Sequence, residues 1–238
     1  MNSIFEIFKI GIGPSSSHTV GPMKAAKKFR DELLNNKNIN NEINIKITLY
    51  GSLAFTGKGH STDTGIILGL SGITPETIDN KLKKITINRV LSKKEILLNN
   101  DFSIPFQIDK NILFDIKTKT NEYSNMMRFS AFNKNKNVLN RIYYSIGGGF
   151  IKQKNERKNK EKNEFPYSFS SSKDLLKKCK KNGFKIHELM MKNESSLDSQ
   201  KNTKNNILKF WSVMDDSIKN GIESKGILEG GLKLKRRA

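Results

Sequence analysis

The chain has 238 residues, 35% of them hydrophobic and 28% charged, and a formal net charge of +20 at pH 7. That length can bury one large core, or one core plus an appendage. The single cysteine, Cys179, excludes an internal disulfide framework and an all-cysteine metal site within the chain. No apolar run is as long as a membrane span and no signal peptide is visible, so we expect a cytoplasmic protein without a membrane partner.

The positive charge raises the alternative of a basic nucleic-acid-binding protein. The lysines are scattered and often accompanied by asparagine, and they cluster only at residues 152–162 and 233–237. No zinc-ligand pattern or aromatic RNA-binding motif is visible in the sequence. Joint enrichment in lysine, asparagine and isoleucine is what codon drift in an AT-rich genome produces, so we expect no specific nucleic-acid partner.

A turn-forming stretch, residues 11–22, leads into the first predicted helix. Apolar side chains then recur every three or four residues up to residue 34, as on one face of a helix. The start of that helix carries four hydroxyls and an imidazole, those of Ser15, Ser16, Ser17, His18 and Thr19. Unpaired N–H groups and the positive end of the helix dipole make such a start a site for anions. The alternative is a multiply capped helix start that binds nothing.

Residues 43–49 alternate between apolar and polar, which predicts a half-buried strand. The glycine-rich segment 51–63 follows as a predicted loop, and residues 65–70 predict a buried helix capped by Thr62 or Asp63. Within the loop, His60 is a candidate catalytic residue, because neutral imidazole suits proton transfer near pH 7. The alternative is a loop histidine that bonds to Asp63.

The middle of the chain gives weaker signals. Residues 75–85 predict an amphipathic helix whose apolar face consists of Ile78, Leu82 and Ile85. Residues 87–116 are ambiguous and predict two short strands.

Two strands are predicted next, at residues 126–132 and 138–146, with residues 133–137 as the connecting turn. The three glycines at residues 147–149 follow. They predict a bulge or a close backbone approach, because the spacing and the following helix of a phosphate-binding loop are absent.

A charged linker at residues 153–165 divides the chain into a domain at residues 1–152 and a helical segment at residues 166–238. The segment predicts three helices, at residues 173–182, 186–193 and 203–220. Serines at residues 170–172 precede the first of these helices as caps, and Gly183 ends it.

Side chains in these helices predict more about packing than about chemistry. Cys179 occupies a core position, and His187 has a structural role. The last helix is predicted to bury one apolar face, made of Ile207, Phe210, Trp211, Met214 and Ile218. The cover for that face lies outside these helices, so we expect them to be loosely held or to form a homodimer.

Four blocks of sequence carry a resemblance to a known family, at residues 3–23, 49–60, 128–132 and 143–151. In order and spacing they resemble the iron–sulfur-dependent L-serine dehydratases, or L-serine ammonia-lyases, over nearly all of the chain. The resemblance implies an α/β (α+β) fold: a sheet with flanking helices similar to an allosteric substrate-binding domain, then a short helical segment that begins the catalytic domain. It also implies a part in converting L-serine to pyruvate and ammonia.

Dehydration of serine removes the α-proton and expels the β-hydroxyl, a poor leaving group that needs a Lewis acid. In the family that this chain resembles, the Lewis acid is the open iron of a 4Fe-4S cluster, held by cysteines of a following catalytic domain. Residues 234–238 resemble the segment just ahead of that domain's main body, so we expect a truncated enzyme. We therefore expect no cluster and no turnover on this chain alone, and a separate cysteine-bearing catalytic chain as its partner.

The resemblance also implies roles for single residues. His60 lies in the block that matches the family's base-bearing loop, and the hydroxyls at residues 15–19 would hold the carboxylate of L-serine. The family pattern His-x-Asn-Gly-Met reads Tyr123-Ser124-Asn125-Met126-Met127 here. The phenol of Tyr123, with a reference pKa of about 10, could donate a proton but would accept one poorly, whereas Asn125 could still bond to substrate. This departure keeps open a non-catalytic serine-binding or regulatory module and the remnant of a decaying gene.

Overall fold

The computed structural model describes residues 3–37, 39–134, 136–156, 164–227 and 234–236 and divides into two compact units. The larger unit is Gly11–Glu156 with Gly226–Lys235, and the smaller one is Met1–Ile10 with Arg157–Lys225 and Arg236–Ala238. The chain thus changes unit within the predicted linker, of which residues 157–163 lie outside the described residues. The first ten residues group with the late helices and not with the rest of the predicted first domain.

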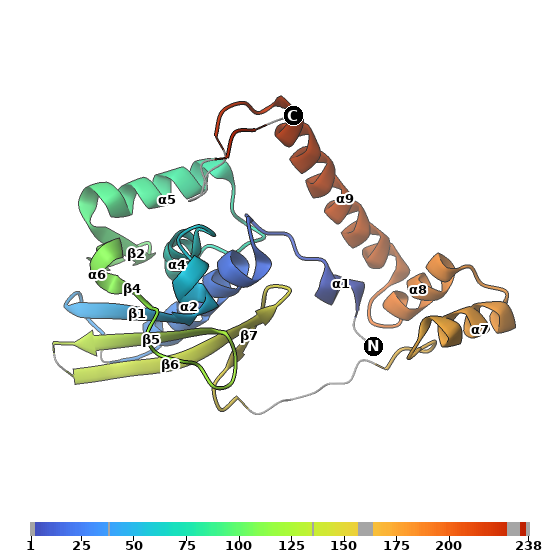
Figure 1. The fold of residues 1–238 in the computed structure, drawn as a ribbon, viewed down its shortest axis with the longest axis horizontal. Helices are drawn as coiled ribbons and strands as arrows, with labels where there is room; N and C mark the ends of the chain where they lie inside the picture. Colours follow the sequence, from blue (N-terminus) through green and yellow to red (C-terminus); the bar gives the residue numbers. More distant parts are fainter. Residues whose placement is uncertain (1–2, 38, 135, 157–163, 228–233, 237–238) are drawn as a thin grey trace. The chain divides into compact units, whose positions relative to one another are not determined.

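A mixed sheet forms the centre of the larger unit, with five strands among the described residues (Figure 1). In spatial order the strands are β4 (Ile112–Asp115), β1 (Ile43–Gly51), β5 (Asn125–Asn133), β6 (Lys136–Gly147) and β7 (Phe150–Gln153). β1 runs parallel to β4, and the other neighbouring pairs are antiparallel. The predicted α/β class is confirmed. The strands predicted at residues 43–49, 126–132 and 138–146 are confirmed as β1, β5 and β6.

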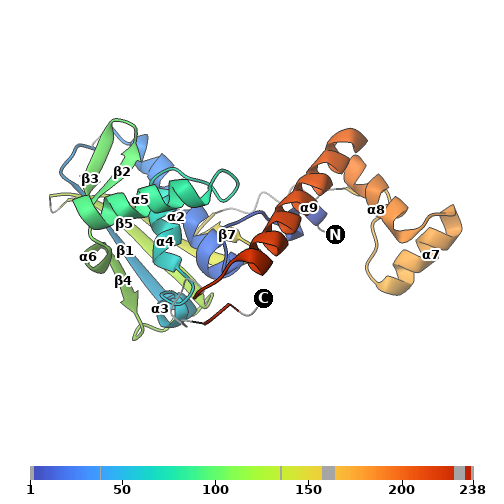
Figure 2. The same cartoon turned by 90° about the horizontal axis from the view of Figure 1, so that it is seen from above.

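Two helices cover one face of this sheet, α2 (Gly21–Leu34) and α4 (Thr62–Leu70), and α5 (Asn80–Lys93) lies beyond them (Figures 1 and 2). Alternate residues of β1 are buried in the core that these helices share: Ile43, Ile45, Ile47 and Leu49. Phe29 of α2 packs on Phe129 of β5, with 5.3 Å between the ring centroids. This period of two determines which side chains of each strand meet the helices.

The contact between α2 and α4 depends on Gly69. A Cβ atom there would lie 2.1 Å from the carbonyl oxygen of Met23 and 2.8 Å from Cβ of Ala26. Since one of these atoms is backbone, a side chain at this position would force the two helices apart.

We expect Gly69→Ala to lower the free energy of unfolding by about 1–3 kcal/mol, the usual cost of overpacking. Gly221→Ala is the matched control, because a Cβ atom at this other helical glycine meets nothing within 4 Å. The control should raise stability by roughly 0.4–1 kcal/mol through the unfolded state. Urea denaturation followed by circular dichroism measures both, and equal stability of the two variants would contradict the close packing of α2 on α4.

The helix predicted at residues 75–85 is wrong in position. α5 begins at Asn80, where the side chain of Asp79 accepts the N–H of Leu82 at 2.7 Å. Side chains of the predicted apolar face are largely in solvent, with Leu82 37% and Ile85 57% exposed, and Val90 is the buried residue of the helix. The helix begins five residues later than predicted, because the carboxylate of Asp79 caps it.

The ambiguous region after α5 contains more strand than predicted. β2 (Glu95–Asn99) and β3 (Phe102–Pro105) form an antiparallel pair, and the short α6 (Ile108–Asn111) leads into β4. Two short strands are present as predicted, but the third, β4, was missed, because it joins the main sheet through a parallel pairing with β1 that no local pattern reveals.

The predicted loop at residues 51–63 is partly helical. α3 (Ser52–Thr56) follows β1 without a connecting residue, and α4 begins at Thr62. Gly51 makes this junction, with φ of 57° and ψ of −134°, and a Cβ atom there would lie 2.2 Å from the carbonyl oxygen of Ser124. Only glycine adopts this conformation readily.

The three glycines after β6 form a bulge, as predicted. Their φ angles are 93°, 58° and 73°, and the pairing of β6 with β7 shifts register between Ser145 and Gly147. The strand β7 itself was not predicted, because its four residues run directly into the charged linker sequence.

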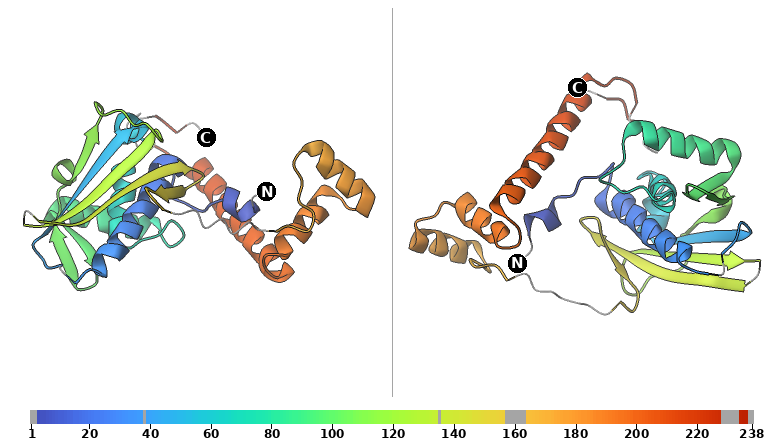
Figure 3. Two further views of the ribbon diagram at one scale, coloured as in Figure 1. Left: turned by 90° about the horizontal axis from the view of Figure 1, so that it is seen from below. Right: turned by 180° about the vertical axis from the view of Figure 1, so that it is seen from behind.

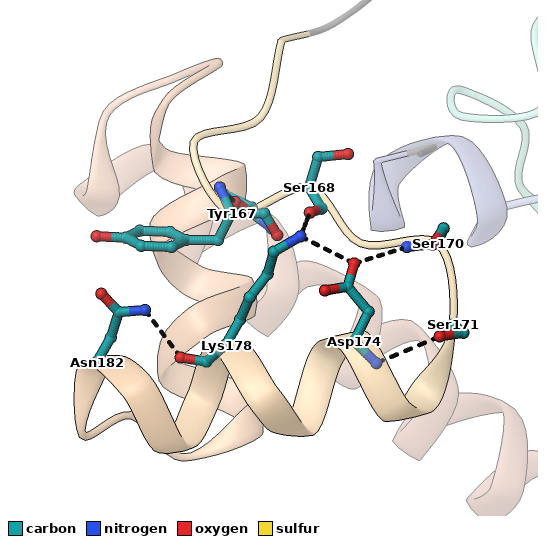
Figure 4. Close-up of polar contacts among 8 residues, drawn as sticks. Tyr167, Ser168, Ser170, Ser171, Asp174, Lys178 and Asn182 are labelled. Atoms are coloured by element: carbon teal, nitrogen blue, oxygen red, sulfur yellow. Dashed lines mark hydrogen bonds and ion pairs between the residues drawn. The ribbon is translucent and has the colours of Figure 1, made fainter.

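The smaller unit contains α1 (Ile4–Ile7), α7 (Ser172–Asn182), α8 (Ile186–Ser195) and α9 (Gln200–Glu223). α7 confirms its predicted ends: Ser171 caps it by accepting the N–H of Asp174 at 3.2 Å, and Gly183 ends it with φ of 68°. The carboxylate of Asp174 also pairs with Lys178 at 2.9 Å (Figure 4). Cys179 is buried, as predicted, and His187 is exposed on α8.

The first residues of the chain are held by a buried carboxylate of α8. Glu194 is 2% exposed, and it accepts the hydroxyl of Ser3 at 2.6 Å and the N–H of Ile4 at 2.9 Å. Phe5 and Phe210 of α9 bring their ring centroids within 5.8 Å of each other. These contacts explain why residues 1–10 group with the late helices.

Much of the predicted apolar face of α9 is uncovered: Trp211, Met214 and Ile218 are exposed, in keeping with the expectation that the cover for this face lies outside these helices. The helix continues through Gly221 to Glu223. Within the smaller unit α9 packs with α8 and α1, through the first half of the helix.

Candidate active site

The turn before α2 is a helix start with two free donors. Ser16–Val20 forms a π-helical turn that continues into α2, and Ser15 caps it by accepting the N–H of His18 on its hydroxyl at 3.2 Å. The carbonyl of Ser15 accepts the N–H of Thr19 at 3.0 Å. The N–H groups of Ser16 and Ser17 have no partner among the described residues. The predicted arrangement of hydroxyls at a helix start is confirmed, and two N–H groups remain for an anion.

Three buried hydroxyls attach this turn to the elements around it. Thr19 donates to the carbonyl of His60 at 2.7 Å, and Thr62 donates to the carbonyl of His18 at 2.5 Å. Ser145 of β6 donates to the carbonyl of Ser17 at 2.7 Å. The fully buried hydroxyl of Thr19 therefore holds the His60 loop in place. The other predicted site residues of the turn, residues 15–18, are partly or fully exposed to solvent.

Two imidazoles face each other at this turn. The rings of His18 and His60 have centroids 4.9 Å apart and are tilted by 40°. Nδ1 of His60 lies 2.9 Å from the carbonyl oxygen of Thr56. A carbonyl only accepts, so Nδ1 carries the proton of the neutral ring and Nε2 keeps a lone pair. His60 does not depend on Asp63 as the alternative proposed, since Asp63 accepts the N–H of Thr64 at 2.7 Å.

His18 is held from both sides by hydroxyls. Its Nδ1 lies 2.8 Å from Oγ of Ser17, and its Nε2 lies 3.0 Å from Oγ of Ser52 at the start of α3. Burial lowers the pKa of His18 below its usual value of 6.5, the charge of His60 lowers it further, and a hydrogen bond with the backbone of Ser52 opposes both. His18 is therefore a neutral ring at pH 7.

We expect the side chain of His18 to titrate below pH 6.5 in the folded chain, as followed by its ring signals in a pH series of NMR spectra. The unfolded chain then binds more protons than the folded chain between the folded pKa and 6.5. The contribution of His18 to the free energy of unfolding is therefore fully present above pH 6.5, and it is lost as the pH drops through the folded pKa. A pKa of His18 at or above 6.5 would contradict the arrangement.

Asn125 joins the site through the sheet. It is the first residue of β5, paired with Gly51 of β1, and its Nδ2 donates to the carbonyl of Ser145 at 3.4 Å. Asn125 lies on the same face of β5 as the buried Met127 and Phe129, which is the face that the helices cover. Its Oδ1 atom is buried and has no partner among the described residues. A buried acceptor of this kind can receive a hydrogen bond from a ligand.

Tyr123 lies away from the two imidazoles. Its ring packs on Tyr144, with centroids 4.9 Å apart, and its hydroxyl accepts from Nζ of Lys152 at 3.4 Å. Tyr144 precedes Ser145 in β6, so these two side chains point to opposite faces of the sheet. Of the predicted site residues, the structure brings together those of the turn with His60 and Asn125, but not Tyr123.

Two residues of the site were missed in the sequence. Ser52 was read as part of a loop, although a serine directly after a glycine at the end of a buried strand is a usable signal. Ser145 is 3% exposed and occupies a core-facing position beside the glycine bulge, where a lone hydroxyl requires a partner. Both act on the first turn from far away in the chain.

The residues present do not fit an iron–sulfur cluster. Such clusters are held by several thiolates, whereas this chain has the single cysteine Cys179, buried in α7. Within the described ranges, no group of three or more histidine, cysteine, aspartate or glutamate side chains could hold a metal ion. In that same part of the chain, no helix has the length and apolar character to cross a membrane.

The sequence of this chain is similar to those of known proteins. The family model of the serine dehydratase beta chain matches residues 3–156. L-serine dehydratase 2 of Escherichia coli K12 is 41% identical over 100% of this chain and 53% of its own length. The L-serine dehydratases of Haemophilus influenzae and Streptomyces coelicolor are 38% and 35% identical over 100% and 99% of this chain, and 53% of each relative. The chain thus spans about half the length of the curated relatives it matches.

Proposed function

The chain belongs to the L-serine dehydratase family, and on that premise we propose that it supplies the carboxylate site and the catalytic base of an L-serine ammonia-lyase. The observation that carries the proposal is the imidazole of His60. Its Nδ1 is committed to the carbonyl of Thr56, and its Nε2 is left as a base beside a helix start with free N–H groups.

The helix start binds the carboxylate of L-serine. The N–H groups of Ser16 and Ser17 donate to it, and the positive end of the helix dipole adds a favourable charge interaction. The neutral ring of His18 forms part of the wall of this carboxylate site. Its hydrogen bonds with the hydroxyls of Ser17 and Ser52 keep the ring in place.

Nε2 of His60 takes the α-proton of the bound substrate. The electron pair of the C–H bond forms the Cα–Cβ double bond as the β-hydroxyl leaves, and aminoacrylate results, which hydrolyses through an imine to pyruvate and ammonia. The ring that accepts the proton becomes a cation, and the carbonyl of Thr56 stabilises it at Nδ1. Oδ1 of Asn125 is the acceptor for the ammonium group of the substrate.

The acid that acts on the β-hydroxyl does not come from the described residues. The family resemblance assigns that role to a 4Fe-4S cluster, and the single cysteine of this chain does not fit one. We assign this role to polypeptide that corresponds to the part of the relatives that this chain does not match.

Reconstitution tests the proposal. This chain, co-expressed with the part of L-serine dehydratase 2 of Escherichia coli that it does not match and handled anaerobically with iron, should form pyruvate from L-serine. The chain alone should form none. A stable, cluster-loaded complex that binds L-serine without converting it would overturn the catalytic role and favour a serine-binding module.

Tyr123→Phe should change kcat less than about tenfold in that complex, well short of the ~10²–10⁴-fold cost of losing a general acid or base. The phenol lies on the face of the sheet opposite Ser145, and its hydroxyl contacts Lys152. Tyr123→His should likewise leave kcat unchanged or raise it. Steady-state assay of pyruvate gives kcat and KM for both, and a hundredfold loss in Tyr123→Phe would show that the phenol takes part in proton transfer.

A further inference from the structure

The second half of α9 presents an uncovered apolar stripe. Its large side chains recur at intervals of three and four residues and therefore share one face of the helix: Trp211, Met214, Ile218 and Ile222. They are 59%, 47%, 51% and 61% exposed. Among the described residues of the smaller unit, no element packs on this part of the helix (Figures 1 and 3).

The stripe continues a core that already exists. In the first half of α9, Thr203 is fully buried and the ring of Phe210 packs with those of Phe5 and Phe8, at centroid distances of 5.8 Å and 6.2 Å. α8 packs against the same helix. One face of α9 is thus covered near the amino-terminal end and open beyond it, which is the pattern of a helix whose packing partner is incomplete.

The comparisons indicate what completes it. The beta-chain model ends at residue 156, so α7, α8 and α9 correspond to the region of the relatives that follows it. The relatives contain about as much sequence again outside the matched region. We propose that the stripe Trp211–Ile222 is the docking surface for the polypeptide that corresponds to this unmatched part of the relatives. The proposal rests on the proposed function, because it names the partner that completes that site.

The stripe supplies enough apolar surface to account for specific association. Burying one large apolar side chain changes an association constant by roughly 10- to 100-fold, and the stripe has four such side chains. A glutamate in the middle of the stripe would place an unpaired charge in the interface. Exposed aliphatic residues elsewhere in the chain would tolerate the same change.

The first measurement concerns the free chain. Trp211 is the only tryptophan of the sequence, so its fluorescence reports on the stripe without interference. We expect emission typical of water-exposed indole and ready quenching by iodide at every protein concentration. Shielded emission in a monomer would overturn the proposal by showing that the chain covers the stripe itself. Shielding that appears with rising concentration, together with a dimer in sedimentation, would overturn it in favour of a second copy.

The second measurement uses co-expression with a probe, the part of L-serine dehydratase 2 of Escherichia coli that this chain does not match. The probe should co-purify with this chain and slow the hydrogen exchange of peptides from residues 208–222 at least tenfold. Ile218→Glu should weaken capture by about tenfold or more, whereas Leu91→Glu, on an equally exposed position of α5, should capture as the unsubstituted chain does. Circular dichroism verifies that both variants keep their helices.

Equal capture by the two variants, or capture without slower exchange in residues 208–222, would overturn the proposal. The proposal would also be overturned if this chain failed to capture the probe while the matched part of the Escherichia coli enzyme captured it. None of these readouts needs turnover. A complex that docks through α9 but forms no pyruvate would refute the proposed function alone.

Discussion

Replacing His60 with alanine is expected to lower kcat of the reconstituted enzyme by about 10²–10⁴-fold, the usual effect of removing a general base. The variant should fold normally. The ring of His60 is half-exposed, and the bond that anchors its loop comes from Thr19 to the carbonyl of residue 60, which alanine retains. The loss should therefore be in proton transfer and not in structure.

The matched control for this prediction is His187→Ala, which removes an exposed imidazole from α8 in the smaller unit. We expect its kcat and KM to equal those of the unsubstituted protein. Parallel denaturation curves for the two variants would separate activity from stability. Near-normal turnover by His60→Ala would show that the loop is structural and that the base lies elsewhere.

Gly51→Ala is expected to lower the free energy of unfolding by about 2–6 kcal/mol. Two costs add: about 1–3 kcal/mol for holding a residue with Cβ in a conformation suited to glycine, and about 1–3 kcal/mol for overpacking. The added Cβ atom would lie 2.2 Å from the carbonyl oxygen of Ser124. That same carbonyl accepts the N–H of Ser52 at 2.8 Å, so the change should also disturb the contact between Ser52 and His18.

Gly147→Ala isolates the first of these costs. Gly147 has φ of 93°, but a Cβ atom there meets nothing within 4 Å. We expect this variant to lose only about 1–3 kcal/mol. Guanidinium denaturation measures both variants, and a Gly51→Ala protein as stable as Gly147→Ala would contradict the close approach of Gly51 to Ser124.

Local patterns predicted the elements whose signals lie within the element itself. The strand at β1 alternates between core and solvent, α7 has a serine cap and a terminal glycine, and the glycine bulge ends β6. The family resemblance is confirmed as well, and it led to the turn before α2 and to the His60 loop. None of these conclusions needed to know which distant residues touch in the fold.

The failures have a common physical cause, which is contact between distant residues. In α5, the predicted apolar residues Leu82 and Ile85 are exposed, because tertiary packing buries Val90 instead. Glu194 binds the start of the chain from 191 residues away. No periodic pattern contains such a pairing.

The candidate site shows the same division. Sequence identified His60 and the hydroxyls of the first turn, but the partners that position them are Ser52, 34 residues from His18, and Ser145, 128 residues from Ser17. The separation of Tyr123 from the site follows from the alternation of β6, which requires knowing the register of the sheet.

The central claim is that this chain holds the carboxylate of L-serine at the N–H groups of Ser16 and Ser17, beside Nε2 of His60. Titration of the isotope-labelled chain with L-serine, followed by NMR, tests it most directly and requires no partner. We expect the largest shifts in the amide signals of Ser16 and Ser17 and in the ring signals of His60, with little response to D-serine. Shifts centred on other parts of the chain, or equal shifts with both enantiomers, would contradict the claim.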